Sequence, residues 1–176
     1  VLPVSVGIAV LAGPMVRVLL GAQWGDTVPL IQILAFSGAV SALTSNNVAA
    51  YLALGRPHLI TVILLARLVL FATIVLVFAS SRSVVAVAYA ELFAALGSLI
   101  VSLPVLLSAL RLRTRDYLAS LWRPMVASAL MGVGLLRVVE TLPDQGGFAG
   151  AVFELLLGIP VGASFYLAIL WALWWL

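Results

Sequence analysis

The residues Leu59–Ala79 read LITVILLARLVLFATIVLVFA, and this stretch decides the fold. Its one charged side chain is Arg67, and the rest is almost entirely Leu, Val, Ile, Ala and Phe. About 20 mostly apolar residues suffice for a helix to cross the hydrocarbon core of a bilayer. The stretch therefore predicts a membrane-spanning helix with one cation inside it.

Five further apolar segments are long enough to span a membrane, and Gly, Pro or charged residues separate them. They are Val4–Leu20, Pro29–Leu54, Val84–Leu110, Leu121–Val139 and Phe148–Leu176. No alternation of polar and apolar residues recurs at the spacing of a membrane barrel. We therefore expect an all-α, polytopic transmembrane helix bundle of about six spans, with a kink at Gly13-Pro14 and a bend near Pro160.

The composition excludes several other classes of protein. Hydrophobic residues make up 65% of the chain and charged residues 9%, against about 45–50% and about 25% in soluble domains. Disorder needs low hydrophobicity and high charge, so it is excluded as well. The chain has no Cys and one His, which leaves no thiolate chemistry and no multi-His metal site. We expect no cofactor, no metal and no catalytic residues.

The basic residues predict orientation rather than nucleic-acid binding, because they are spread between the apolar segments. If all six segments span, the arginines outside Leu59–Ala79 divide into Arg56, Arg111, Arg113, Arg115 and Arg123 on one side and Arg17, Arg82 and Arg137 on the other. Cytoplasmic loops carry the excess of Arg and Lys. The side that holds Arg111–Arg123 is therefore expected to be cytoplasmic, and no nucleic acid is expected as a partner.

The segment Thr114–Arg123 has the pattern of a short amphipathic helix. Thr114 is a suitable N-cap, and Asp116 lies in the first turn. Tyr117, Leu118, Leu121 and Trp122 fall on one face. The pattern predicts a helix lying in the membrane interface that leads into the next span at Pro124. A solvated basic loop is the alternative.

Arg67 is the most informative position, since an ionisable residue inside a span is costly and is a functional-site hypothesis by default. Folding the third and fourth segments back on each other brings Glu91 within about 6–8 Å of Arg67 along the helix axis. The two side chains are long enough to meet. The pair either fixes helix register alone or gives way when Arg67 binds an anion in a water-filled cavity.

The second segment carries the most polar side chains. Those that we expect to line a cavity are Ser37, Ser41, Thr44, Asn47 and Tyr51. Hydroxyl, amide and phenol groups on one helix suit a hydroxylated ligand. Hydrogen bonds between packed helices are the alternative explanation. A stripe of small residues on the fourth segment, at intervals of four, predicts close helix packing there: Ala86, Ala90, Ala94, Ser98 and Ser102.

The order of three blocks resembles the polysaccharide flippases of the Wzx type, within the multidrug/oligosaccharidyl-lipid/polysaccharide exporter superfamily. The blocks are PMVRVLLGAQW at Pro14–Trp24, VPLIQILA at Val28–Ala35 and LALGRP at Leu52–Pro57. The Trp122-Arg123-Pro124 step also resembles that family. Val84-Val85 departs from it, since relatives often carry a Gly where that helix begins. The resemblance covers about residues 1–139.

The resemblance implies a two-lobed transporter of lipid-linked oligosaccharide in the bacterial cytoplasmic (inner) membrane. Residues 1–139 would form second-lobe helices, and residues 140–176 a trailing loop and a C-terminal span. Because the chain opens with Val inside an apolar run, we expect a fragment whose partner is the N-terminal half of the same protein. Its other expected partners are the bilayer and an undecaprenyl-pyrophosphate-linked oligosaccharide.

Two other functions remain open from the sequence. An ion-coupled drug exporter of the same superfamily needs a titratable carboxylate in its cavity, and Glu91 is the candidate. A membrane scaffold without a transport cycle predicts that Arg67 and Glu91 form a closed pair with no cavity beside it. No phosphate-binding loop, HExxH motif or paired-carboxylate site is present, so an enzyme is the least favoured reading.

Overall fold

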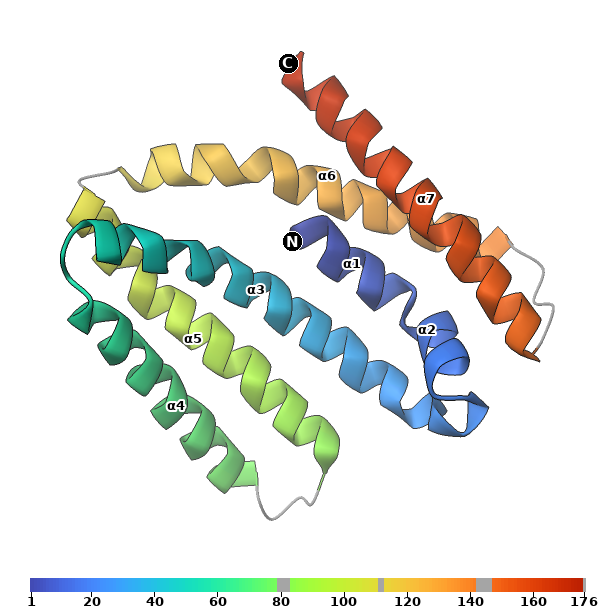
Figure 1. Cartoon of the computed structure of the whole chain (residues 1–176), viewed down its shortest axis with the longest axis horizontal. Coiled ribbons are helices and arrows are strands. Elements are labelled where there is room, and N and C mark those ends of the chain that lie inside the picture. The colour runs from blue at the N-terminus through green and yellow to red at the C-terminus, as the bar shows by residue number, and fades with distance from the viewer. Residues whose placement is uncertain (79–82, 111–112, 142–146, 176) are drawn as a thin grey trace. The chain divides into compact units, whose positions relative to one another are not determined.

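The computed structural model describes residues 1–78, 83–110, 113–141 and 147–175, and these residues contain no β-strand. The elements are α1 (Leu2–Val10), α2 (Ala12–Leu19), the 3₁₀ helix η1 (Ala22–Thr27), α3 (Val28–Ala53), α4 (His58–Phe78), α5 (Val84–Leu110), α6 (Thr114–Thr141) and α7 (Gly147–Trp174), as labelled in Figure 1. The predicted all-α class is confirmed.

Within the described residues, five helices are long and apolar enough to cross a membrane, and the number rises to six if α1 and α2 form one span. The chain is therefore a multi-pass membrane protein. Helices α4 and α5 match the predicted spans to within one residue at each end. The large apolar side chains of α4, such as Leu68 and Leu76, are mostly exposed, which suits a surface that faces lipid.

The first predicted span is broken, and the position of its kink differs from the prediction. Helices α1 and α2 meet at Leu11 and are bent by 71°, two residues before Gly13. Pro14 has no N–H to donate to the Val10 carbonyl, and its ring crowds that carbonyl. The disruption therefore falls in the turn that precedes the proline.

The predicted separate helix at Thr114–Arg123 is a second difference. Helix α6 runs without a break from Thr114 to Thr141 and passes through Pro124, so the segment forms the beginning of a longer helix. Proline removes one backbone hydrogen bond, and a long helix with many others tolerates this loss. The part of α6 that qualifies as a span begins at Ala119.

The chain divides into two compact units, which are treated separately below. The first comprises residues 1–35 and 119–176, and the second comprises residues 36–118. Residue 139, where the resemblance places a domain boundary, lies inside the first unit. That boundary stays a prediction.

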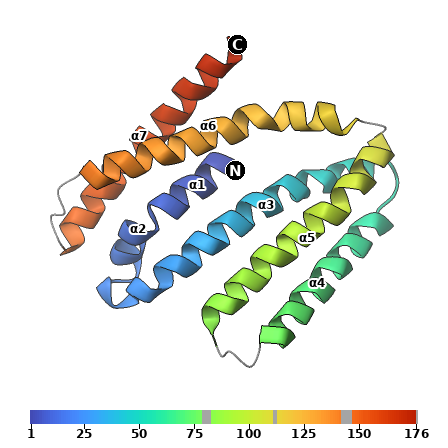
Figure 2. The same cartoon turned by 180° about the vertical axis from the view of Figure 1, so that it is seen from behind.

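In the second unit, α4 and α5 pack along each other as an antiparallel pair (Figures 1 and 2). Gly97 of α5 makes this approach possible, because a Cβ atom there would lie 2.7 Å from the Leu70 side chain. The predicted small-residue stripe is largely buried: Ala90, Ala94, Ser98 and Ser102 all expose 2% or less. Small residues allow helix backbones to approach closely in lipid.

In the first unit, α1 and α2 pack against α7. A Cβ atom at Gly158 of α7 would lie 2.8 Å from the Leu11 side chain, and one at Gly132 of α6 would lie 2.6 Å from Val6. Leu11 is 3% exposed. Glycine therefore supplies the notches for large apolar side chains in this unit too.

Candidate functional site

Arg67 lies in the interior of α4, nine residues after the helix begins at His58. Its Nη2 group forms an ion pair with Oε1 of Glu91 on α5. The same Nη2 donates a hydrogen bond of 3.1 Å to the Ser41 hydroxyl on α3. The predicted meeting of Arg67 and Glu91 is confirmed, and Ser41 joins them as a third member from a third helix.

The pair is partly accessible, since the Arg67 and Glu91 side chains expose 27% and 32% of their surface. An unpaired charge inside a span costs several kcal/mol, so each residue needs the other in an apolar environment. A charged side chain that is not fully enclosed can contact a molecule beside it. Arg67 lines a small pocket in which such a molecule could lie.

The pocket has a volume of about 140 Å³ and lies between α3, α4 and α5. Its lining residues are Thr44, Asn47, Val48 and Tyr51 of α3, Ile60, Ile63, Leu64 and Arg67 of α4, and Ser98 and Ser102 of α5. At about 30 Å³ for each water molecule in the liquid, it has room for about five. It can hold one small polar group, such as a phosphate or one sugar ring, but not an oligosaccharide.

The hydroxyl groups around this pocket donate to backbone carbonyls of the helices. Thr44 donates to the Ser41 carbonyl at 2.8 Å, and Ser98 to the Ala95 carbonyl at 2.9 Å. The buried Tyr51 hydroxyl crosses from α3 to α5 and donates to the Ser102 carbonyl at 3.1 Å. A hydroxyl that has donated its proton still has oxygen lone pairs. These oxygens are therefore free to accept hydrogen bonds.

Asn47 supplies the complementary donor. Its side chain is 5% exposed, and its Nδ2 group has no hydrogen-bond partner among the residues that the structure describes. A buried amide left without a partner costs about 1–3 kcal/mol. The side chain lines the pocket, so a molecule in the pocket would restore the missing bond.

The structure brings together most of the residues predicted for the site. Arg67, Thr44, Asn47 and Tyr51 line the pocket, while Ser41 and Glu91 contact Arg67 directly. Ser37 lies nearer the beginning of α3, is buried, and does not line the pocket.

Two residues that line the pocket, Ser98 and Ser102, were not predicted for the site. The sequence predicts them only as packing residues of the small-residue stripe, although their hydroxyl groups also suit a polar pocket. Outside this pocket, Glu154 is a carboxylate in the interior of another candidate span, α7. Glu154 is half-buried and lies seven residues after that helix begins. It is the one charged residue in the otherwise apolar run 151–157, and this pattern could have identified it from the sequence. No group of three or more potential metal ligands occurs among the described residues.

Comparison with known proteins gives one distant match. The chain is 25% identical over 173 residues to the teichuronic acid biosynthesis protein TuaB of Bacillus subtilis (strain 168). The match covers 96% of this chain but about a third (34%) of that relative's length. No family model and no solved structure matches the chain.

Proposed function

We propose that this chain is part of a membrane flippase that moves undecaprenyl-pyrophosphate-linked oligosaccharide across the bacterial inner membrane for surface polysaccharide synthesis. The similarity to a teichuronic acid biosynthesis protein supports a role in polysaccharide synthesis or export. The order of the blocks at Pro14–Trp24, Val28–Ala35 and Leu52–Pro57 supports the flippase assignment within that role. The proposal assigns no catalytic step to this chain.

One observation carries the proposal: a membrane-embedded arginine lines a pocket beside a buried amide donor that lacks a partner. Guanidinium groups bind phosphate oxygens through several N–H donors in a fixed plane. Both hydrogen bonds of Arg67 to Glu91 and Ser41 use Nη2. The other N–H groups of the guanidinium, on Nε and Nη1, are the ones that would donate to a ligand.

Glu91 gives the site a neutral resting state. While the pocket holds no anion, the carboxylate balances the guanidinium, and the unit carries no isolated charge in lipid. A ligand phosphate would take over part of this role, and its sugar hydroxyls would donate to the oxygens of Thr44, Ser98 and Ser102. Given a volume of about 140 Å³, the pocket would hold one segment of the headgroup.

The test is surface polysaccharide in cells whose complete protein carries Arg67→Ala. We expect at least a tenfold loss of surface polysaccharide per molecule of the protein present in the membrane, because the phosphate loses its charged donor. Arg67→Lys should restore part of the activity, since it keeps the charge but not the planar donor set. Arg137→Ala on α6, where the arginine side chain is 77% exposed, is the matched control and should leave export unchanged. Normal polysaccharide with Arg67→Ala would falsify the proposal.

The pocket also bears on the two alternatives. A scaffold predicts a closed ion pair with packed protein around it, whereas Arg67, one member of the pair, lines a pocket. A drug exporter needs a carboxylate free to exchange protons or cations, whereas Glu91 is engaged by Arg67. Drug resistance that is lost with Glu91→Gln while polysaccharide export stays normal would favour the exporter.

A further inference from the structure

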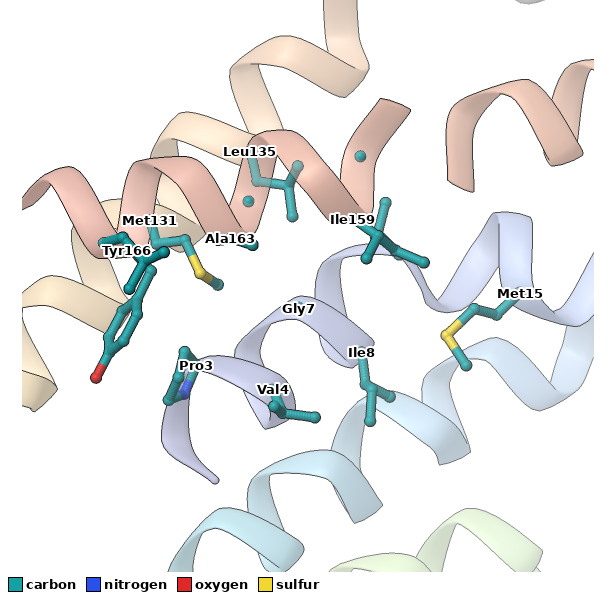
Figure 3. A pocket seen from close by; sticks show the side chains of 14 residues that line it. Pro3, Val4, Gly7, Ile8, Met15, Met131, Leu135, Ile159, Ala163 and Tyr166 are labelled. Atoms are coloured by element: carbon teal, nitrogen blue, oxygen red, sulfur yellow. The ribbon is translucent and has the colours of Figure 1, made fainter. Parts of the chain in front are cut away.

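A second pocket lies in the first unit, and its lining is almost wholly apolar. It has a volume of about 480 Å³ and is bounded by α1, α2, α6 and α7. Figure 3 shows side chains from α1, α6 and α7 on different sides of it, with the Tyr166 hydroxyl directed away from the apolar groups. No charged residue lines this pocket.

The pocket has a buried floor and an exposed rim. Leu11, Met131 and Leu135 form the floor and expose 3%, 3% and 1% of their surface. Val4, Ile159 and Leu167 lie at the rim and expose 61%, 62% and 64%. These elements belong to candidate spans, so a rim exposed in this way would be accessible to a chain that enters sideways from the bilayer.

The volume favours a hydrocarbon chain over a protein helix. With about 30 Å³ for a group the size of a water molecule, the pocket holds about 16 such groups, and a methylene is of similar size. Three turns of α-helix, about 16 Å long and 10–12 Å across, need about 1,300 Å³ or more. The pocket is therefore too small to enclose a helix, whereas it can enclose one lipid chain of about 16 carbons.

We propose that this pocket is a binding site for one acyl chain of a bilayer lipid. Filling an apolar pocket of this size restores dispersion contacts that its lining otherwise lacks. Two methionines, Met15 and Met131, line it, and their flexible side chains adapt to an irregular occupant. The proposal rests on the first unit alone and does not depend on the flippase function.

Gly7 offers a direct way to block the site. A Cβ atom at Gly7 would have no neighbour within 4 Å, and Gly7 lines the pocket. The substitution Gly7→Leu therefore adds a large apolar side chain at a pocket position whose Cβ meets no neighbour, and it raises helix propensity. Gly13 is the matched control, since its Cβ would also meet nothing within 4 Å and it does not line the pocket.

The experiment is photo-crosslinking in vesicles of phosphatidylethanolamine, part of which carries a diazirine near the end of a 16-carbon acyl chain. The complete protein is reconstituted and irradiated, and the crosslinks are mapped by mass spectrometry. We expect crosslinks concentrated on pocket residues of α1 and α7, reduced at least fivefold by Gly7→Leu and unchanged by Gly13→Leu. As a second variant, Ala163→Phe should reduce them similarly, because Ala163 also lines the pocket.

Three results would overturn the proposal. Labelling spread evenly over the lipid-facing side chains of α4 and α7, and insensitive to Gly7→Leu, would mean that no specific site exists. Displacement of the label by a few molecules of undecaprenyl phosphate per protein would assign the pocket to an isoprenoid chain instead. Crosslinks from the pocket to a second copy of the protein would assign it to a protein contact.

Discussion

The pocket beside Arg67 and the pocket beside Gly7 are built by similar means and have opposite chemistry. Each adjoins helices that glycine allows to approach closely, at Gly97 against Leu70 in one unit and at Gly158 against Leu11 in the other. The first pocket adds an ion pair, an amide and three serine or threonine hydroxyls. The second adds methionines and aliphatic side chains.

The contrast indicates which residues of a membrane helix decide the kind of ligand that its pocket can bind. Backbone approach depends on small residues and is common to both units. The residues that face the remaining space decide whether it suits a polar group or a hydrocarbon chain. Four sets of substitutions in the polar unit test this separation through the free energy of unfolding.

The largest effect should come from breaking the Arg67–Glu91 pair. Arg67→Leu or Glu91→Leu leaves one charge unpaired, and we expect a loss of about 2–3 kcal/mol, below the about 3–5 kcal/mol of a fully buried pair because both side chains are partly exposed. The double variant should lose less than either single one. Unfolding by SDS in mixed micelles gives the three values.

The control for this cycle is the Arg137–Glu140 pair on α6. Its atoms lie 3.3 Å apart, but its side chains are 77% and 63% exposed. Such pairs contribute about 0–1 kcal/mol, so Arg137→Leu should change stability little. Strictly additive losses for Arg67 and Glu91 would mean that the pair does not act as a unit.

A second, smaller effect is expected at the glycine contact of the polar unit. In Gly97→Ala the new methyl group would lie 2.7 Å from the Leu70 side chain, and overpacking of this kind costs about 1–3 kcal/mol. Gly38→Ala is the matched control on α3, since its Cβ meets nothing within 4 Å. The difference between the two variants removes the propensity gain that alanine brings to both.

Leu70→Ala tests the cause of that difference. Combined with Gly97→Ala, it should recover part of the lost stability, because the new methyl group then has room. If Gly97→Ala is as stable as Gly38→Ala, the close approach of α4 and α5 is not held by this contact.

The spans could be predicted because hydrophobicity and helix-breaking residues act locally. The limits of α4 follow from Gly55-Arg56-Pro57 and a long apolar run, and those of α5 from a similar run. The effect of proline on helix continuity was predicted less accurately. Pro14 coincides with a break at Leu11, whereas α6 continues through Pro124. Whether a helix breaks at a proline depends on the contacts of the neighbouring turns, which the sequence does not display.

The site was predicted in part for the same reason. The Arg67–Glu91 pair follows from the antiparallel arrangement of two adjacent spans and simple arithmetic on helical rise. The bond from Tyr51 to the Ser102 carbonyl joins residues 51 positions apart. It depends on how three helices rotate about their own axes. No local sequence pattern determines that rotation, so the sequence predicts only a packing role for Ser98 and Ser102 of α5.

The third prediction concerns this Tyr51 bond. Tyr51→Phe keeps the ring and removes the hydrogen bond to the Ser102 carbonyl, at an expected cost of about 1 kcal/mol. Tyr89→Phe is the control, because Tyr89 is 46% exposed and its ring stacks near Phe93. Thermal unfolding in detergent compares the two. An equal change in both variants would mean that the bond between α3 and α5 contributes nothing.

The smallest change in stability should accompany the most revealing substitution, Asn47→Leu. If the pocket were dry, replacing an unpartnered amide with an apolar group of similar size would raise stability by about 1–3 kcal/mol. If water fills the pocket and accepts from Nδ2, its loss offsets that gain, and the net change stays within about 0.5 kcal/mol. We expect the second outcome, because the pocket has room for water and several polar partners for it.

Hydroxyl-radical labelling distinguishes these outcomes independently of stability, since it requires water close to the labelled ring. Labelling of Tyr51, which is 2% exposed, should fall in Asn47→Leu and persist in Val48→Leu, a neighbouring substitution that also lines the pocket. A stabilised Asn47→Leu variant with unchanged labelling would show that the polar pocket is dry. The contrast with the apolar pocket would then rest on the ion pair alone.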